Sequence, residues 1–182
     1  MSADKLQSPF PPVRRVVTGH TADGKSTILT DDIQPTTFFH PGSANAIHDL
    51  YRTNESPAVM DAEIVSGEWV DEIKKDPSQV SELGSTFRSV DFAPGSVSVR
   101  KPAFVSLPDS SAESLYMQPF HRTVTLDYGI ITKGSIVVEL NHGERVTLNE
   151  GDTIIQRGTI HNWRNESTEW ARMYCVMLGM GL

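Results

Sequence analysis

The last third of the chain is divided into short β-branched runs by regularly spaced turn residues, and this pattern limits the fold more than any other feature. Five runs follow one another: HRTVTLDYGIITKG, SIVVELN, ERVTLNEG, DTIIQRG and TEWARMYCVML. Turn signals separate them at Lys133-Gly134, Asn141-His142-Gly143, Asn149-Glu150-Gly151 and Arg157-Gly158. Short strands repeating about every ten residues are typical of an all-β sandwich or barrel. Within SIVVEL, Ile136, Val138 and Leu140 share one face, as expected of a strand with one side in a core.

The first two thirds of the chain add strands and one short helix to this prediction. Apolar and β-branched residues predict strands at 47–53 and 85–96, and EWVDEIKK at 68–75 predicts a short surface helix. Residues 1–12 are polar and proline-bearing, which predicts a flexible arm. A chain of 182 residues is typical of a single domain, here residues 13–182, in which the β-rich segments before and after the central acidic stretch belong to one sheet system.

A stretch near the N-terminus matches a phosphate-binding motif. GHTADGKST, at 19–27, fits G-x-x-x-x-G-K-[ST] at each fixed position from Gly19 to Ser26. A phosphate loop must run directly into a helix whose N-terminal amides bind the phosphates. Here Asp23-Gly24 lies between two β-branched runs, and STILTDD is poor helix material. The sequence therefore predicts a β-hairpin and no nucleotide cofactor, and a nucleotide hydrolase is the weakest hypothesis.

Charge and hydropathy argue against several classes of partner. The net charge is −7 at pH 7, which disfavours nucleic-acid binding and electrostatic attachment to an anionic membrane. No apolar run approaches the roughly 20 residues that cross a bilayer, and residues 1–15 lack the apolar segment of a secretory signal. A cytoplasmic protein is expected. The single cysteine, Cys175, lies in an apolar run and is interpreted as a buried, inert thiol.

Three polar residues in the last third are candidates for one catalytic or metal site: His121, Asp127 and His161. His121 and Asp127 are six positions apart, so an unbroken strand places them on the same face. His161 follows the turn at Gly158 on a separate strand, which an antiparallel barrel brings to the same interior. Two imidazoles and a carboxylate are the donor set of a facial triad, which suits Fe(II) and tolerates Zn, Mn, Co or Ni. The alternative is a metal-free site with a His–Asp pair as general acid and base.

The same residues resemble the two metal-binding motifs of the cupin family. The first family motif, H-x-H-x3-E-x6-G, keeps its register from His121 through Asp127 to the final glycine. The second, G-x5-P-x-G-x2-H-x3-N, is matched one residue shorter by GDTIIQRGTIHNWRN, with His161 at the histidine. The resemblance covers residues 120–178. It implies a double-stranded β-helix, or jelly-roll barrel, with the metal ligands inside.

The departures from the family pattern bear on the metal. Thr123 replaces the second histidine, Asp127 replaces the glutamate, and Arg157 replaces the proline. Losing one imidazole weakens metal retention, because affinity depends on ligand number and geometry. The resemblance thus implies either one divalent transition metal on the three remaining candidates or none. It also implies a homodimer, in which the N-terminal hairpin completes the barrel or is exchanged between subunits.

Each candidate also has a structural alternative. His121 would cap a strand end, Asp127 would form an ion pair with Arg122 or Arg172, and His161 would lie on the surface. The shared motif register argues against all three alternatives holding together.

Four further residues are candidates for substrate contacts: Thr123, Tyr128, Gln156 and Trp163. Thr123 and Trp163 each lie two positions after a candidate histidine and share its strand face. Thr123 would bind a water or a substrate oxygen, and Trp163 would form an aromatic wall. Core packing is the alternative for Trp163. Tyr128 and Gln156 are polar groups whose orientation the sequence leaves open.

The fold alone does not determine chemistry. The leading hypothesis is an enzyme that acts on a small, oxygen-rich organic molecule by non-redox chemistry such as dehydration, decarboxylation or isomerisation. Resemblance to small cupins of specialised metabolism implies a polyketide-like or aromatic substrate. An Fe(II)-dependent dioxygenase that uses His121, Asp127 and His161 is the alternative, and a ligand-binding barrel without catalysis is the third hypothesis.

Overall fold

The computed structural model describes residues 7–39, 42–58, 69–75, 80–97 and 120–180. These ranges are mostly β-strand with one helical turn, which is shorter than the predicted helix. The elements are β1 (Arg14–His20), β2 (Ser26–Ile33), β3 (Thr37–Phe38), β4 (Ala46–Thr53), α2 (Glu72–Lys75), β5 (Ser85–Phe92), β6 (Thr125–Lys133), β7 (Ser135–Leu140), β8 (Arg145–Asn149), β9 (Thr153–Arg157), β10 (His161–Arg164) and β11 (Ala171–Gly179). In the part of the chain described, no helix has the length and apolar character needed to span a membrane.

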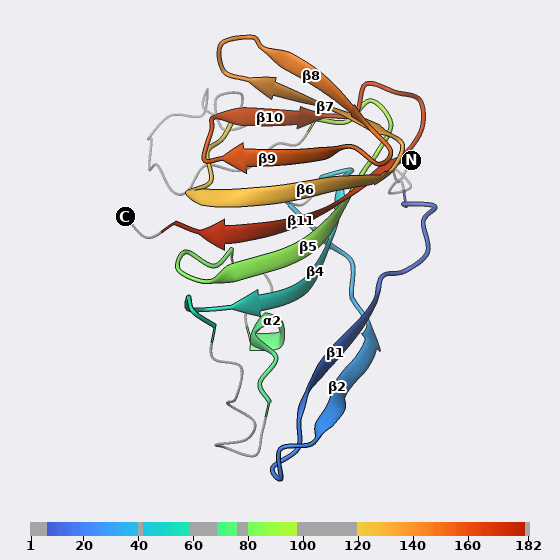
Figure 1. Cartoon of the computed structure of the whole chain (residues 1–182). Helices are drawn as coiled ribbons and strands as arrows, with labels where there is room; N and C mark the ends of the chain where they lie inside the picture. The colour runs from blue at the N-terminus through green and yellow to red at the C-terminus, as the bar shows by residue number, and fades with distance from the viewer. Residues whose placement is uncertain (1–6, 40–41, 59–68, 76–79, 98–119, 181–182) are drawn as a thin grey trace, which may run out of the picture.

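The strands form two sheets that enclose the core, beside a separate hairpin (Figure 1). The larger sheet has the strand order β3-β4-β5-β11-β6-β9, and the smaller has the order β10-β7-β8. All of these neighbours pair antiparallel. β4 and β5 from the first half of the chain thus join β11 from its end, as predicted, whereas β1 and β2 form a sheet of their own, so the prediction of one sheet system does not extend to the hairpin. The predicted all-β jelly roll is confirmed.

Alternating side chains from both sheets fill the space between them. On β11, Met173, Cys175 and Met177 are buried toward the interior, and on β7 the predicted inward residues Ile136 and Val138 are almost fully buried. The core cluster comprises Val90, Phe92, Ile131, Ile136, Val138, Leu148, Trp163, Ala171, Met173, Cys175 and Met177. The period-2 pattern that predicted the strands therefore also places the core.

The chain passes from the larger sheet to the smaller at Gly134, between β6 and β7. Its φ angle is +70°, a conformation that glycine adopts without steric cost. A Cβ at this position would lie 2.6 Å from the carbonyl oxygen of Trp170. The predicted turn at Lys133-Gly134 is a corner between sheets that requires glycine.

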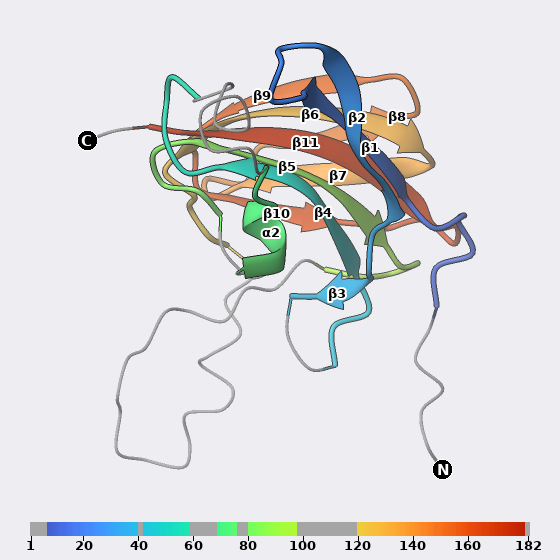
Figure 2. The same ribbon diagram turned by 90° about the horizontal axis from the view of Figure 1, so that it is seen from below.

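The segment that matches the phosphate-binding motif is a β-hairpin, as predicted. β1 and β2 pair antiparallel, and Gly24 in the connecting turn has a φ angle of +78°. Ser26 of the motif begins β2, so a strand stands where a phosphate loop needs a helix. The hairpin forms its own two-stranded sheet and does not complete the barrel (Figures 1 and 2). Arg15 attaches it, donating to the Leu50 carbonyl oxygen at 3.1 Å and to the Asp71 carboxylate at 2.7 Å.

Residues 7–12, predicted as part of a flexible arm, are in contact with the barrel. The Ser8 hydroxyl donates to the Asp91 carboxylate at 2.5 Å, and Arg172 donates to the carbonyl oxygen of Pro11 at 3.2 Å. Arg172 and Asp91 themselves form a buried ion pair. The ion pair of Arg172 and Asp91 thus holds residues 7–12 against the barrel. The polar composition of these residues did not indicate this contact. The earlier residues of the arm lie outside the described ranges.

Candidate active site

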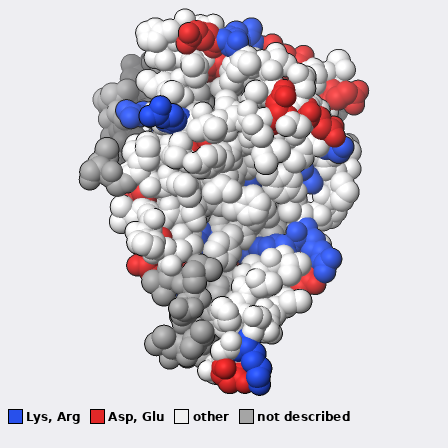
Figure 3. All heavy atoms as spheres, in the orientation of Figure 1, with Lys and Arg blue, Asp and Glu red and all other residues white. Residues whose placement is uncertain are grey.

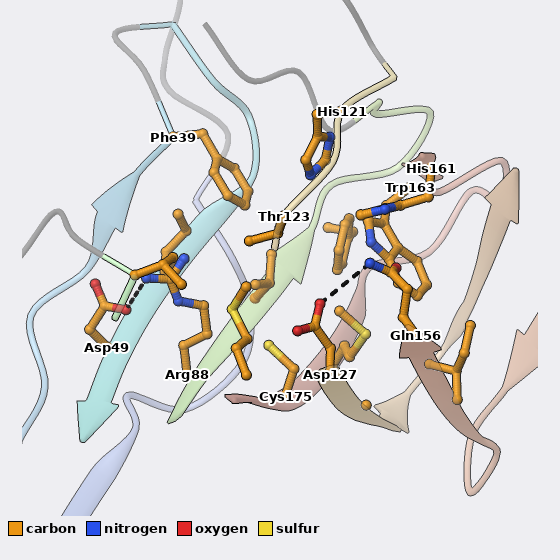
Figure 4. Close-up of a pocket in the computed structure, with 18 of the residues that line it drawn as sticks. Phe39, Asp49, Arg88, His121, Thr123, Asp127, Gln156, His161, Trp163 and Cys175 are labelled. Atoms are coloured by element: carbon orange, nitrogen blue, oxygen red, sulfur yellow. Dashed lines mark hydrogen bonds and ion pairs between the residues drawn. The ribbon is translucent and has the colours of Figure 1, made fainter. Parts of the chain in front are cut away.

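A cavity of about 290 Å³ lies between the two sheets (Figure 4). Most of its lining is apolar: Phe38, Phe39, Ile47, Val80, Val90, Phe92, Ile154, Trp163, Met173, Cys175 and Met177. The polar and charged lining residues are Thr37, Asp49, Arg88, His121, Thr123, Asp127, Gln156 and His161. An apolar cavity with a few convergent polar groups is the usual form of a small-molecule site.

His121 and His161 lie side by side in the cavity wall. Their backbones form an isolated antiparallel bridge, in which each amide donates to the other's carbonyl oxygen at 3.0 Å. The ring centroids are 4.4 Å apart. The Nδ1 of His161 donates to the Thr159 carbonyl oxygen at 2.8 Å, which leaves Nε2 as an acceptor in the neutral ring. Burial lowers the pKa of His161, so this ring is neutral at pH 7.

The local structure around His121 differs from the prediction. An unbroken strand from His121 to Asp127 is expected from the sequence, whereas β6 begins at Thr125 and the chain bends at Val124. The bridge to His161 holds His121 in its place instead. Both His121 and Asp127 nevertheless line the cavity, because the bridge positions His121 and strand β6 positions Asp127.

Asp127 on β6 faces the cavity beside Gln156 on β9. The two residues are cross-strand partners, and Gln156 Nε2 donates to Asp127 Oδ2 at 3.4 Å (Figure 4). Asp127 Oδ1 and Gln156 Oε1 accept no hydrogen bond from any described residue. Burial raises the pKa of the Asp127 carboxyl and outweighs two opposing effects, a side-chain hydrogen bond from Thr125 to this carboxyl and the charge of Arg88. Asp127 is therefore suited to exchange a proton closer to neutral pH than an ordinary carboxyl.

Three of the four predicted substrate contacts line the cavity: Thr123, Gln156 and Trp163. The Trp163 ring meets the His161 ring edge-on, with centroids 5.9 Å apart, and Trp163 also belongs to the core cluster. Both interpretations of Trp163 therefore apply. Tyr128 is a correction: it is 46% exposed and does not line the cavity. It is one residue from inward-facing Asp127, and neighbouring side chains of a strand point to opposite faces.

Two of the structural alternatives, a surface position for His161 and an ion pair between Asp127 and Arg172, are not observed. His161 is only 2% exposed and is not a surface residue. Arg172, the alternative partner of Asp127, pairs with Asp91 at 2.5 Å. Cys175 lines the cavity, but burial raises the pKa of its thiol to about 12, which agrees with the predicted inert thiol.

Asp49 and Arg88 add a buried ion pair that the sequence analysis missed. Arg88 Nη2 on β5 lies 2.8 Å from Asp49 Oδ1 on the neighbouring β4. Burial raises the pKa of Asp49, against the opposing effect of Arg88. A signal was present in the sequence. Asp49 lies two positions after Ile47 and Arg88 two before Val90, so each charge shares a strand face with core residues.

The three predicted metal ligands are not assembled around one point. Among the described residues, no three His, Cys, Asp or Glu side chains come close enough to hold a metal ion. The two imidazoles are adjacent, while Asp127 is directed toward Gln156. By donor chemistry the histidine pair fits a divalent transition metal, and the bond from His161 Nδ1 to a carbonyl oxygen is of the kind that orients metal-binding imidazoles.

The two sheets and the cavity between them define a jelly-roll barrel with an internal site, and comparison with known proteins gives the family. The family model described as Cupin domain matches residues 113–177. Phomopsin biosynthesis cluster protein D of Diaporthe leptostromiformis is 33% identical over 167 residues, which cover 90% of this chain and 77% of the relative. Cupin-domain-containing oxidoreductase virC of Hypocrea virens is 30% identical over 176 residues, covering 93% and 79%. The chain belongs to the cupin family.

Two further similarities extend over most of the chain. Oryzines biosynthesis cluster protein J of Aspergillus oryzae is 29% identical over 170 residues, covering 93% of this chain and 84% of the relative. Among solved structures, the cupin domain of Schizosaccharomyces pombe Cnp3 has a TM-score of 0.49 at 10% identity, covering 93% of this chain and 88% of that chain.

Proposed function

We propose that this protein is an enzyme of specialised metabolism that binds a small, oxygen-bearing, mostly apolar organic molecule in the cavity and uses Asp127 to transfer a proton. The observation that carries the proposal is the Asp127 carboxyl. It faces the cavity, burial raises its pKa, and its Oδ1 accepts no hydrogen bond from a described residue. Such a group acts as a general base or acid near neutral pH. The names of two relatives, which refer to oryzines and phomopsin biosynthesis clusters, support the metabolic setting.

The chemical step follows from these groups. The Asp127 carboxylate removes a proton from a carbon beside a carbonyl; the electron pair of the broken C–H bond forms a C=C bond, and the π pair of the carbonyl moves onto its oxygen. Return of the proton to another carbon isomerises the molecule, whereas loss of a β-hydroxyl with that proton, as water, dehydrates it. The neutral His161 ring accepts a hydrogen bond from a substrate hydroxyl through Nε2.

An oxidoreductase is the second candidate, and the adjacent imidazoles of His121 and His161 favour it. Four relatives, virC among them, carry the name cupin-domain-containing oxidoreductase. A divalent transition metal held by the two histidines would supply a Lewis acid or a redox centre. The predicted Fe(II)-dependent dioxygenase is one form of this candidate.

Exchange of carbon-bound hydrogen with solvent separates the two candidates. The probe is 1-tetralone, a bicyclic ketone with acidic hydrogens beside its carbonyl, incubated in D2O and followed by proton NMR. Proton transfer by Asp127 predicts that the protein accelerates deuterium incorporation under nitrogen and in the presence of a chelator. The redox candidate predicts no acceleration there, but bound metal and oxygen consumption after loading with Fe(II), both lost in His161→Ala. A barrel that binds 1-tetralone and does neither is not an enzyme for this class of molecule.

A further inference from the structure

The cavity has two polar regions on the larger sheet, separated by an apolar strip. Arg88 on β5 is the cross-strand partner of Cys175 on β11, and Asp127 on β6 is the partner of Met177 on the same strand. Arg88 and Asp127 are thus two strands apart and offset by two residues along β11, which places their backbones roughly 12 Å apart at a strand spacing of about 4.8 Å and a rise of about 3.4 Å per residue. Figure 4 shows Cys175 between them and Asp49 beyond Arg88.

The two regions differ in the polar atoms that they leave without a hydrogen bond: Arg88 Nε and Asp49 Oδ1 in the first, and only acceptors in the second. Arg88 is 8% exposed, and its Nε donates to no described residue. At the other region, Asp127 Oδ1 and Gln156 Oε1 are buried acceptors without a described donor. Buried polar atoms are normally hydrogen-bonded, so unpaired groups around a cavity indicate where a ligand's polar atoms bind. A ligand that satisfies both regions has an acceptor oxygen near Arg88 and a hydrogen donor near Asp127.

The charges around Arg88 restrict the kind of acceptor oxygen. The guanidinium is already balanced by the Asp49 carboxylate at 2.8 Å, and both side chains are about nine-tenths buried. Asp127 is the only other acidic residue among the described lining of the cavity. A substrate carboxylate would leave this enclosed space with an excess of negative charge, which is costly to bury. A neutral carbonyl oxygen accepts the Arg88 hydrogen bond without that cost.

We propose that Arg88, held in place by Asp49, is a substrate-binding residue that hydrogen-bonds the carbonyl oxygen of a neutral ketone, aldehyde or lactone. The inference rests on the proposed function only in taking this cavity as the substrate site. A buried pair of charges contributes little net stability compared with apolar residues of similar volume. Stability of the fold therefore does not explain the presence of this ion pair, whereas substrate binding does.

The test compares three ligands with one carbon skeleton by isothermal titration calorimetry: 1-tetralone, tetralin and 1,2,3,4-tetrahydro-1-naphthoate. The full chain is expected to bind 1-tetralone at least tenfold more tightly than tetralin or the carboxylate. The double variant Asp49→Leu/Arg88→Met removes both charges together, so that neither is left buried alone. In that variant 1-tetralone and tetralin are expected to bind within about twofold of each other, with tetralin affinity unchanged. Asp31→Leu/Arg14→Met, which removes an exposed ion pair of the hairpin, serves as the matched control and keeps the tenfold preference.

The outcomes separate this inference from the proposed function. Equal binding of 1-tetralone and tetralin by the unmodified chain, or a preference that persists in Asp49→Leu/Arg88→Met, refutes the role of Arg88 and leaves the cavity as a binding site. Tighter binding of the carboxylate than of 1-tetralone refutes the neutral carbonyl. If none of the three ligands binds, the cavity does not take molecules of this class, and both the inference and the proposed function are wrong. Asp49→Asn provides an independent check, since removing the balancing charge should strengthen carboxylate binding at least tenfold.

Discussion

The imidazole rings of His121 and His161 lie with their centroids 4.4 Å apart, and the backbone amides of the same two residues donate to each other's carbonyl oxygens at 3.0 Å. The two residues are forty positions apart in the chain, and one pair of hydrogen bonds sets both their backbone register and the approach of their side chains. His161 is buried and neutral, so the pair sits in the cavity without a full charge on that ring.

The pH dependence of stability should report the burial of His161. Its pKa in the folded state lies below the ordinary value of 6.5, so the stability it contributes is present above pH 6.5 and is lost as the pH falls through the folded-state pKa. His161→Asn keeps a donor near the Thr159 carbonyl but does not titrate. We expect the fall in melting temperature between pH 8 and pH 5.5 to be smaller in His161→Asn than in the unmodified chain. If the melting temperatures of the two proteins fall equally between pH 8 and pH 5.5, burial does not lower the pKa of His161.

Asp127 should lower the stability of the fold at neutral pH. Its folded-state pKa lies above the ordinary value of 3.8, so its favourable contribution is present below pH 3.8 and is lost as the pH rises through the folded-state value. Asp127→Asn should therefore melt at a higher temperature than the unmodified chain at pH 7.5 and at the same temperature near pH 3.5. Each kcal/mol appears as about 2–4 °C for a chain of this size. A lower melting temperature for Asp127→Asn at pH 7.5 is the result that excludes this account of the carboxyl.

Trp163 should matter for both stability and binding. Its ring is part of the core cluster and of the cavity wall, so Trp163→Ala leaves a void and should reduce the free energy of unfolding by about 3–5 kcal/mol. Trp163→Phe should cost less and keep binding of tetralin within an order of magnitude. Urea denaturation measures the first effect and calorimetry the second. Ile28→Ala, at an exposed hairpin position, should change stability by about 0.5 kcal/mol or less.

The homodimer stays a prediction, and the outer face of the larger sheet is where it can be tested. Phe87, Val176, Tyr128 and Ile155 are neighbours across β5, β11, β6 and β9, and three of them are more than a third exposed. The middle of the face in Figure 3 carries few charges. An exposed apolar face is a candidate protein–protein interface, and we expect the dimer to form there. Ile155→Lys should shift the mass measured by light scattering from two chains to one, whereas Val146→Lys on β8 should not. A dimeric Ile155→Lys protein would place the interface elsewhere.

The alternation of side chains along a strand explains both the correct predictions of buried residues and the error at Tyr128. It placed Ile136 and Val138 in the core and Trp163 beside His161, because β7 and β10 are regular strands. The same rule, applied from Asp127, would have turned Tyr128 outward, as the structure shows. Asp-Gly turn chemistry was sufficient to separate the hairpin from a phosphate loop.

The remaining features depend on contacts between distant segments. The bridge that holds His121 forms outside any regular strand, so no local pattern encodes it. Asp49 and Arg88 come from strands that the motif comparison does not cover, and their pairing requires β4 and β5 to be neighbours. The anchoring of Ser8 by Asp91 likewise joins residues more than eighty positions apart. Sequence periodicity predicts on which face of a strand a side chain lies, but not which distant residue it contacts.

The most direct measurement of the central claim is the rate at which 1-tetralone exchanges its carbonyl-adjacent hydrogens with D2O, compared between the unmodified chain and Asp127→Asn under nitrogen. The account predicts that the unmodified chain accelerates exchange and that Asp127→Asn loses about 100-fold or more of that acceleration, with calorimetric affinity for the ketone retained. Glu144→Gln, an exposed carboxyl in the turn between β7 and β8, should exchange at the unmodified rate. Equal exchange rates for the unmodified chain and Asp127→Asn would contradict the account.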